Sequence, residues 1–228
     1  MAEGFALAST ADVLIDSLRK ERLPMTDFIA TYRPMPPLTP EDRTYIEQNF
    51  YTLEELCLGR SVTPDEYRSQ IREGLLPLPT YLMDEIEMYP GDFFVFPDSV
   101  GRLGRMKEEF TERYVAAAAA YGGPASTEQA QEEYTAYLSG EYGACLRSVS
   151  PESIFLKEFA LTRIRTLLDA PNPGDVEWSA RLRTWVNRLD GMEREFAPCD
   201  TARFGCASSR ERYIDRARQE FPTCFSSR

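Results

Sequence analysis

The chain has 228 residues, with 37 acidic and 26 basic side chains, a formal net charge of −11 and no histidine. This length supports a real core in one large domain or two small ones, and the negative charge disfavours binding to phosphate backbones or anionic lipid. The lack of histidine excludes Ser-His-Asp catalysis, Cys-His catalysis and His-ligated metals. Acid and base chemistry must therefore come from carboxylates, Tyr, Lys or Cys.

Five cysteines without paired short spacings predict reduced thiols, and we expect no metal site. The first residues carry acidic side chains within their apolar stretch and no basic leader, which is not typical of a secretory signal. No apolar run reaches the roughly 20 residues that span a bilayer. We therefore expect a cytoplasmic protein that does not enter a membrane.

The N-terminal region, residues 1–37, is predicted to be a helix over 8–22 followed by a proline-rich connector. Thr39 then precedes Pro40, and acidic residues follow in the next two positions. A capping side chain, a proline at the first helical position and early acidic residues predict the start of a helix here.

A module over residues 38–100 is predicted to contain two short amphipathic helices, over 52–58 and 64–73, separated by a turn at Gly59. Thr63 is the expected cap of the second helix. The sequence "LLPLPTYLMDEIEMYPGDFFVFP" follows, and its aromatic and β-branched residues predict extended chain that forms a small hairpin or wing.

Residues 101–228 are predicted to form a helical half, with helices over "RMKEEFTERYVAAAAAY", "STEQAQEEYTAYLSG" and "SPESIFLKEFALTRIRTLLDAP", and another from about 208 to 220. The clearest periodicity of apolar residues lies in the sequence between the third and the fourth of these predicted helices. Its apolar residues step by 4, 3, 4, 3 and 4, which predicts a stripe buried against a partner helix: Trp178, Leu182, Trp185, Leu189, Met192 and Phe196. The expected fold class is mainly α with a small β wing.

The segment "YTLEELCLGRSVTPDEYRSQIREGLLPLP" resembles the start of MerR-type winged-helix domains, in which the second helix of a helix-turn-helix enters the DNA major groove. Three basic residues oppose five acidic ones in this stretch, a net charge of −2 where a DNA reader should be positive. We therefore expect a borrowed scaffold and no nucleic-acid partner. A MerR-like regulator, with the helical half as sensor and dimerisation unit, is the alternative.

The segment "TYLMDEIEMYPGDFF" places four carboxylates among aromatic and thioether side chains. A carboxyl group beside such surface is partly desolvated, which favours general acid and base chemistry, and Glu87 is the strongest candidate. The alternative is that these acids line an exposed strand edge and discourage aggregation.

A third candidate site lies in "CDTARFGCASSRERYIDRAR", where Arg203 and Arg210 flank Gly205 just before a predicted helix start. Such an arrangement can hold a carboxylate or a phosphate. Local ion pairs and a helix cap explain the same residues equally well.

Three segments together, "LTPEDRTYIEQNFYTLEELCLGRSVTPDEYRSQIREGLLPLPTYLMDEIEMYPGDFF", "GEYGACLRSVSPESIFLKE" and "DTARFGCASSRERYI", carry a wider resemblance. They are similar to a family of bacterial natural-product biosynthesis proteins that includes the β-carboline-forming Pictet-Spenglerases. The resemblance covers about residues 38–220. It implies condensation of tryptophan, or a substituted tryptophan, with an aldehyde.

The resemblance implies that Glu87 is the acid and base, and that Arg60 or Arg72 holds the substrate. The cyclases carry a histidine between two prolines where this chain has Leu78. The other implied substrate contacts are aromatic stacking and an arginine on the amino-acid carboxylate, or on a phosphate if the aldehyde is a sugar phosphate: Tyr81, Phe93, Arg203 and Arg210. No cofactor is implied.

A third hypothesis is a non-catalytic partner protein of a biosynthetic cluster that uses the stripe from Trp178 to Phe196 as its interface. Because the helical half offers apolar area and members of the resembled family pair, we also expect a homodimer.

Overall fold

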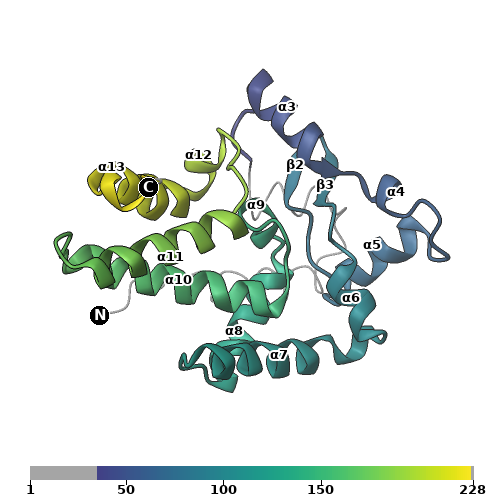
Figure 1. Ribbon diagram of the computed structural model, residues 1–228. Helices are drawn as coiled ribbons and strands as arrows, with labels where there is room; N and C mark the ends of the chain where they lie inside the picture. The colour runs from purple at the N-terminus through teal and green to yellow at the C-terminus, as the bar shows by residue number, and fades with distance from the viewer. Residues whose placement is uncertain (1–34, 227–228) are drawn as a thin grey trace.

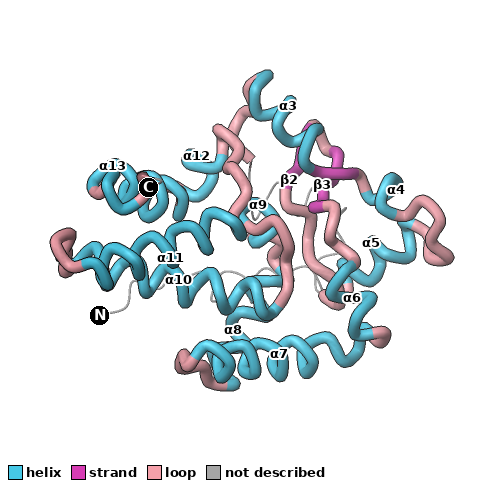
Figure 2. The backbone as a smooth tube through the Cα atoms, viewed as in Figure 1, coloured by secondary structure: helices cyan, strands magenta, loops and turns pink. Residues whose placement is uncertain are grey.

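A computed structural model describes residues 35–226 and shows a mainly helical protein with a small three-stranded antiparallel sheet (Figures 1 and 2). The helix predicted over residues 8–22 lies outside the described residues. The sheet and the first helices lie at one end of the molecule, and the long helices of the second half lie at the other (Figure 1). No helix among residues 35–226 combines the length and apolar character needed to cross a membrane.

Threonine caps start the first three described helices, α3 (Pro40–Asn49), α4 (Leu53–Leu56) and α5 (Pro64–Arg72). In each, the threonine hydroxyl accepts a bond from the third helical residue, whose carboxylate accepts one from the threonine backbone. These reciprocal bonds satisfy backbone donors that a helix start leaves unpaired. The predicted starts at Thr39 and Thr63 are therefore confirmed.

The sheet has the strand order β1 (Phe50–Tyr51), β3 (Ile86–Pro90), β2 (Tyr81–Met83). The hairpin of β2 and β3 confirms the predicted extended segment, and its two turn residues, Asp84 and Glu85, both have positive φ. Two-residue hairpin turns of this kind match the twist of the strands they join. Strand β1 pairs with β3 and was not predicted.

The chain beyond β3 differs from the predicted extended structure, because Val95–Val100 form the helix α6. Tertiary packing explains the difference. The ring of Phe96 lies 5.9 Å from that of Phe110 and 5.6 Å from that of Tyr137, at the edge of the core of the helical half. Burial of this aromatic side chain outweighs the local preference for extended backbone.

The helical half contains α7 (Met106–Tyr121), α8 (Thr127–Leu138), α9 (Tyr142–Cys145), α10 (Pro151–Asp169) and α11 (Val176–Met192), preceded by the short 3-10 helix η1 (Leu103–Arg105). Helices α10 and α11 lie side by side (Figure 1). The apolar stripe of α11 packs against α10 and the C-terminal helices of the same chain. Trp178, Leu182 and Leu189 of the stripe are therefore buried within the chain, and Trp185 and Met192 are partly buried.

The C-terminal segment is less regular than the predicted single helix over about 208–220. It contains α12 (Asp200–Phe204), a wide π-helical turn η2 (Arg210–Asp215), α13 (Arg216–Glu220) and a short 3-10 helix η3 (Pro222–Cys224). Helix α11 also ends at Met192, before Phe196, because Glu193 forms a bridge with Leu146.

Two glycines allow the sheet module to lie close against the helical half. A Cβ at Gly140, where φ is +77°, would lie 2.0 Å from the carbonyl oxygen of Leu78. A Cβ at Gly143 would lie 2.1 Å from the Thr80 hydroxyl oxygen. Leu78 N–H donates to the Leu138 carbonyl at 2.9 Å across the same junction. The segments predicted as separate regions, 38–100 and 101–228, are therefore closely packed at this point.

Candidate active site

The β2-β3 hairpin separates the predicted site residues onto two faces. Leu82 is paired with Glu87, and Tyr81 with Met88. Because side chains alternate along a strand, Glu87 and Tyr89 point toward α4 and α5, whereas Tyr81 points the opposite way. The cluster compositions agree: Tyr89 packs with residues of α4 and α5, and Tyr81 packs with α3 and the segment around Cys199.

Glu87 is held by Arg68 of α5. Arg68 Nε donates to Glu87 Oε2 at 2.9 Å, and the hydroxyl of Tyr89 lies 3.4 Å from the same oxygen. The Glu87 side chain is 7% exposed and that of Arg68 is 23% exposed. The carboxylate is therefore nearly enclosed, and solvent reaches the pair mainly along the arginine.

Arg68 is surrounded by more negative charge than it neutralises. Its Nη2 donates to Glu54 at 2.7 Å, and its Nη1 donates to Asp65 at 3.2 Å. With Glu87, three carboxylates face one guanidinium, a formal net charge of −2. Glu54 is 59% exposed and Asp65 is 94% exposed. Ion pairs with such exposed groups contribute about 0–1 kcal/mol, so a ligand can replace them.

Aromatic rings lie on the side of the Glu87-Arg68 pair that faces the protein core. The rings of Tyr89 and Phe93 are 4.8 Å apart, and Phe94 lies 4.8 Å from Phe93 and 4.4 Å from Tyr67. The Arg60 guanidinium lies 4.0 Å from the centre of the Phe94 ring, donates to the Tyr67 hydroxyl at 3.1 Å and pairs with Asp98. Glu87, Phe93 and Arg60 thus belong to the same face.

The opposite face of the hairpin holds a separate buried polar cluster. The Tyr81 hydroxyl donates to Asp200 Oδ2 at 2.8 Å, and Arg203 Nη1 lies 3.6 Å from Asp200 Oδ1. The Arg203 side chain is 2% exposed, between the rings of Tyr81 and Phe204. Burial, followed by the charge of Asp200, raises the pKa of Tyr81 well above its ordinary value. Tyr81 and Arg203 are therefore not adjacent to Glu87.

The two remaining predicted arginines lie elsewhere. Arg72 is exposed at the end of α5, and Arg210 pairs with Asp190 at 2.7 Å in the helical half. The arginine that contacts Glu87 is Arg68, which was not among the predicted substrate residues. The sequence position of Arg68 could have indicated a buried role. The spacing i, i+3, i+4, i+7 of a buried stripe is present at Pro64, Tyr67, Arg68 and Ile71. A charged residue on such a stripe needs a buried partner.

Leu78, which occupies the position of the histidine in the resembled cyclases, is 3% exposed and packs with Tyr89 and Phe93 in the cluster around α4 and α5. Its side chain offers no titratable group.

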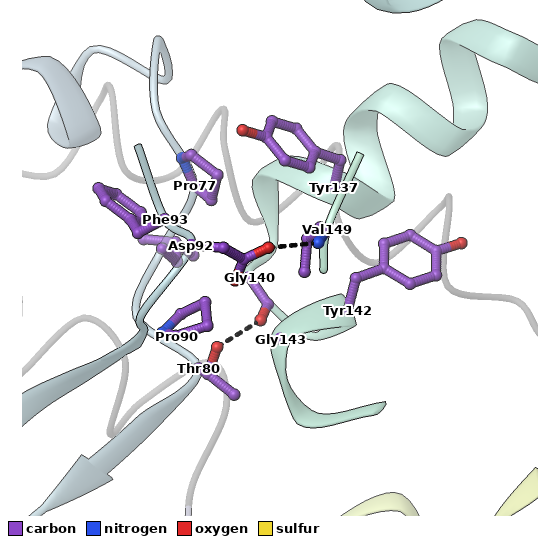
Figure 3. Close-up of a pocket in the computed structure, with 11 residues that line it drawn as sticks. Pro77, Thr80, Pro90, Asp92, Phe93, Tyr137, Gly140, Tyr142, Gly143 and Val149 are labelled. Carbon is purple, nitrogen blue, oxygen red and sulfur yellow. Dashed lines mark hydrogen bonds between the residues drawn. The ribbon is translucent and has the colours of Figure 1, made fainter. Parts of the chain in front are cut away.

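A cavity of about 20 Å³ lies between the hairpin and the helical half (Figure 3). Its wall includes Asp92, whose Oδ2 accepts from Val149 N–H at 2.5 Å, and Thr80, whose hydroxyl donates to the Gly140 carbonyl at 2.9 Å. In the described part of the chain, the buried Asp92 Oδ1 has no hydrogen-bond partner, and burial raises the pKa of this carboxyl group. A cavity of this volume has room for about one water molecule and is too small for a substrate.

Among the residues that the structure describes, no three His, Cys, Asp or Glu side chains are grouped as metal ligands. No curated protein and no solved structure matches the chain. A protein-family profile matches residues 106–222, just over half of the chain, so the match covers the helical half and leaves Arg68 and Glu87 outside it. The chain belongs to this family, which is described as a family of unknown function (DUF6058).

Proposed function

We propose that the chain is a cofactor-independent Pictet-Spengler cyclase that condenses tryptophan, or a substituted tryptophan, with an aldehyde at Glu87. The observation that carries the proposal is the nearly enclosed Glu87 carboxylate, paired with Arg68 inside a region of net negative charge. The resemblance of residues 38–220 to the β-carboline-forming cyclases supports the same reaction.

In the proposed reaction, Glu87 first donates a proton and then removes one. The amine adds to the aldehyde and gives a carbinolamine, whose hydroxyl leaves as water when Glu87 delivers a proton, so that an iminium forms. The indole ring then attacks the iminium carbon, and the Glu87 carboxylate removes the ring proton that restores aromaticity. General acid and base catalysis of this kind contributes roughly 10²–10⁴-fold in rate.

The negative charge around Arg68 favours the cationic intermediate. Carboxylates that are fixed before the reaction stabilise positive charge as it develops, because they need not reorganise. The Glu87 carboxylate lies 3.4 Å from the Tyr89 hydroxyl, and Glu54 and Asp65 add to the negative potential from the solvent side.

Arg68 is the proposed ligand of the substrate carboxylate. Its Nη atoms bond to Glu54 and Asp65, whose exposed carboxylates the amino-acid carboxylate can displace, while Nε stays on Glu87. A guanidinium suits this role because it holds two carboxylates through separate edges. The bound carboxylate would place the amine and the indole toward Glu87 and the rings of Tyr89 and Phe93.

We also propose that residues 53–90 form a winged-helix-like scaffold that does not read DNA. The order of α4, a turn, α5 and an antiparallel hairpin supports the resemblance. Arg68 of α5 is engaged by three carboxylates and Arg60 of the preceding turn by Asp98, which leaves Arg72 as the exposed arginine of α5. A reader of the major groove needs such side chains free on its surface.

The test is incubation of the purified chain with tryptophan and a panel of aldehydes, with products followed by mass spectrometry. The expected product has the mass of tryptophan plus aldehyde minus water. Glu87→Gln keeps an acceptor for Arg68 Nε but cannot transfer the proton, and we expect it to lower kcat by about 10²–10⁴-fold.

Glu85→Gln is the matched control, because it makes the same chemical change two residues away on an exposed turn position. We expect it to keep wild-type activity. Circular dichroism establishes that each variant is folded. No product with any aldehyde, or equal activity in Glu87→Gln and wild type, would refute the proposal.

A further inference from the structure

The helical half encloses a second ionic cluster that the proposed cyclase reaction does not use. Lys157 of α10 lies at its centre, and its Nζ donates to Cys145 Sγ of α9 at 3.0 Å. Glu193 Oε1, just after α11, lies 3.7 Å from the same nitrogen and accepts a hydrogen bond from Ser209. Cys145, Lys157 and Glu193 are all buried.

The choice of lysine at this position is unusual in this chain. The sequence contains 3 lysines among its 26 basic residues. Arginine is the usual residue for buried ion pairs, because its guanidinium makes several fixed hydrogen bonds and is weakly hydrated. A primary amine differs from a guanidinium in one chemical respect that matters here: after it loses a proton, it is a nucleophile.

Glu193 is placed to receive that proton. Its Oε2 is fully buried and has no hydrogen-bond partner among residues 35–226. Burial raises the pKa of Glu193, so that its carboxylate accepts a proton more readily than an exposed one. Burial works to lower the pKa of Lys157, but the neighbouring Cys145 and Glu193 outweigh it and keep the amine protonated in the resting protein.

We propose that Cys145 and Lys157 form a reversible covalent S–N cross-link when a peroxide oxidises the thiol. The Cys145 sulfur attacks hydrogen peroxide, the O–O bond breaks, and a sulfenic acid and water form. The Lys157 ammonium passes one proton to Glu193, and its nitrogen attacks the sulfur. The S–O bond breaks and the hydroxyl leaves as water with a second proton from the nitrogen. Two thiol equivalents reverse the link, giving back thiol and amine with one disulfide. Sulfenic acids condense with backbone nitrogen in the same way.

The geometry selects this cysteine. Within residues 35–226, Cys145 is the cysteine whose sulfur accepts a hydrogen bond from a lysine, and α9 and α10 already hold the two atoms in contact. The other cysteines serve as internal controls: Cys57, Cys199, Cys206 and Cys224. The link would tie α9, which carries the close-packed Gly143, to the long helix α10.

The experiment treats the folded wild-type chain with hydrogen peroxide, blocks remaining thiols in denaturant and digests with trypsin. Trypsin cleaves after Arg113, Arg147 and Arg163, but not after a cross-linked Lys157. The expected species is the peptide 114–147 joined to 148–163, with the summed mass less two hydrogen atoms. The chain loses one of its five titratable thiols, and dithiothreitol restores it.

Lys157→Arg keeps the positive charge and removes the amine, and Cys145→Ser removes the sulfur. Neither variant should give the joined peptides. The wild-type digest decides the proposal even if both variants fold poorly. Free Lys157 beside a sulfinic acid at Cys145 would overturn it, and joined peptides that contain an additional oxygen would overturn the direct S–N bond.

Discussion

Two ionic pairs of this protein, Glu87-Arg68 and Lys157-Glu193, are built in opposite ways. The Glu87-Arg68 pair lies between a hairpin and a short helix, and exposed carboxylates connect it to solvent. The Lys157-Glu193 pair is enclosed by α9, α10 and the end of α11, and Glu193 is 0% exposed.

This difference separates a pair that exposed carboxylates connect to solvent from a pair that the protein encloses. The pairs of Arg68 with the exposed Glu54 and Asp65 contribute little to stability and can be exchanged for a ligand at small cost. An enclosed pair must stay matched, because the loss of one partner leaves a charge without solvation. Mutations at the two pairs should therefore affect different quantities: activity at Glu87 and stability at Lys157.

The largest expected effect on stability is that of Lys157→Met. Removal of the amine leaves Glu193 buried without its cation, which should lower the free energy of unfolding by about 3 kcal/mol. Urea denaturation measures this loss. Lys107→Met, an exposed position on α7, is the matched control and should change stability by less than about 0.5 kcal/mol. Equal losses of unfolding free energy in Lys157→Met and Lys107→Met would contradict the view that the enclosed pair needs its cation.

The second prediction concerns pH. Burial, with the Tyr142 hydroxyl bond acting against it, raises the pKa of Glu133 from 4.5 to about 7. Because the folded state binds this proton more tightly, the contribution to stability is complete below pH 4.5 and is lost as the pH rises to about 7. Between pH 4.5 and about 7, the free energy of unfolding of wild type should therefore fall by on the order of 2–3 kcal/mol relative to that of Glu133→Gln.

Urea titrations of both proteins at several pH values measure that difference. The matched substitution is Glu132→Gln, one residue earlier on the exposed side of α8, which should retain the wild-type pH dependence. If Glu133→Gln retains the wild-type pH dependence as well, burial does not raise the pKa of the Glu133 carboxyl group.

The third prediction tests the far face of the hairpin. Tyr81→Phe removes the hydroxyl that donates to Asp200, and it leaves a buried acceptor with one bond fewer. We expect a loss of about 1–2 kcal/mol in stability with cyclase activity kept, because Tyr81 faces away from Glu87. Tyr51→Phe, on an exposed ring, is the control. Loss of activity without loss of stability would place substrate on the Tyr81 face.

The smallest effect is expected at the start of α5. Thr63→Ala removes the hydroxyl and the reciprocal bond with Glu66, which should cost about 1 kcal/mol in thermal or urea unfolding. Ser61→Ala, two residues earlier in the exposed turn, should change little. If Thr63→Ala lowers the free energy of unfolding as much as Lys157→Met does, then the helix cap contributes as much to stability as the enclosed ion pair.

Signals confined to a few neighbouring residues were enough to predict many of the helices. Thr39 with Pro40, Thr63 with Pro64 and Ser150 with Pro151 each mark a helix start that the structure confirms. These motifs could be read directly because the cap and its partner are three residues apart.

Features that depend on tertiary packing could not be predicted in this way. Strand β1 has two residues and no periodicity, and α6 forms because Phe96 is buried by helices that follow it in the sequence. The contact between Arg68 and Glu87 joins residues 19 apart and depends on how the hairpin packs on α5.

The candidate site shows the same limit. The segment around Glu87 was predicted from its carboxylates and aromatic residues, yet the separation of Tyr81 from Glu87 follows from strand register. That register depends on a turn at Asp84 and Glu85 that lacks the glycine typical of such hairpins. The pairing of Asp200 with Tyr81 likewise needs α12 to fold back over the sheet.

The most direct test of the proposed site is a crystal structure of the chain soaked with tryptophan. We predict density between the hairpin and α5, with the amino-acid carboxylate on Arg68 in place of Glu54 and the indole beside Glu87. Tryptophan bound on the other face of the hairpin, next to Tyr81 and Arg203, would contradict the assignment of Glu87 as the acid and base.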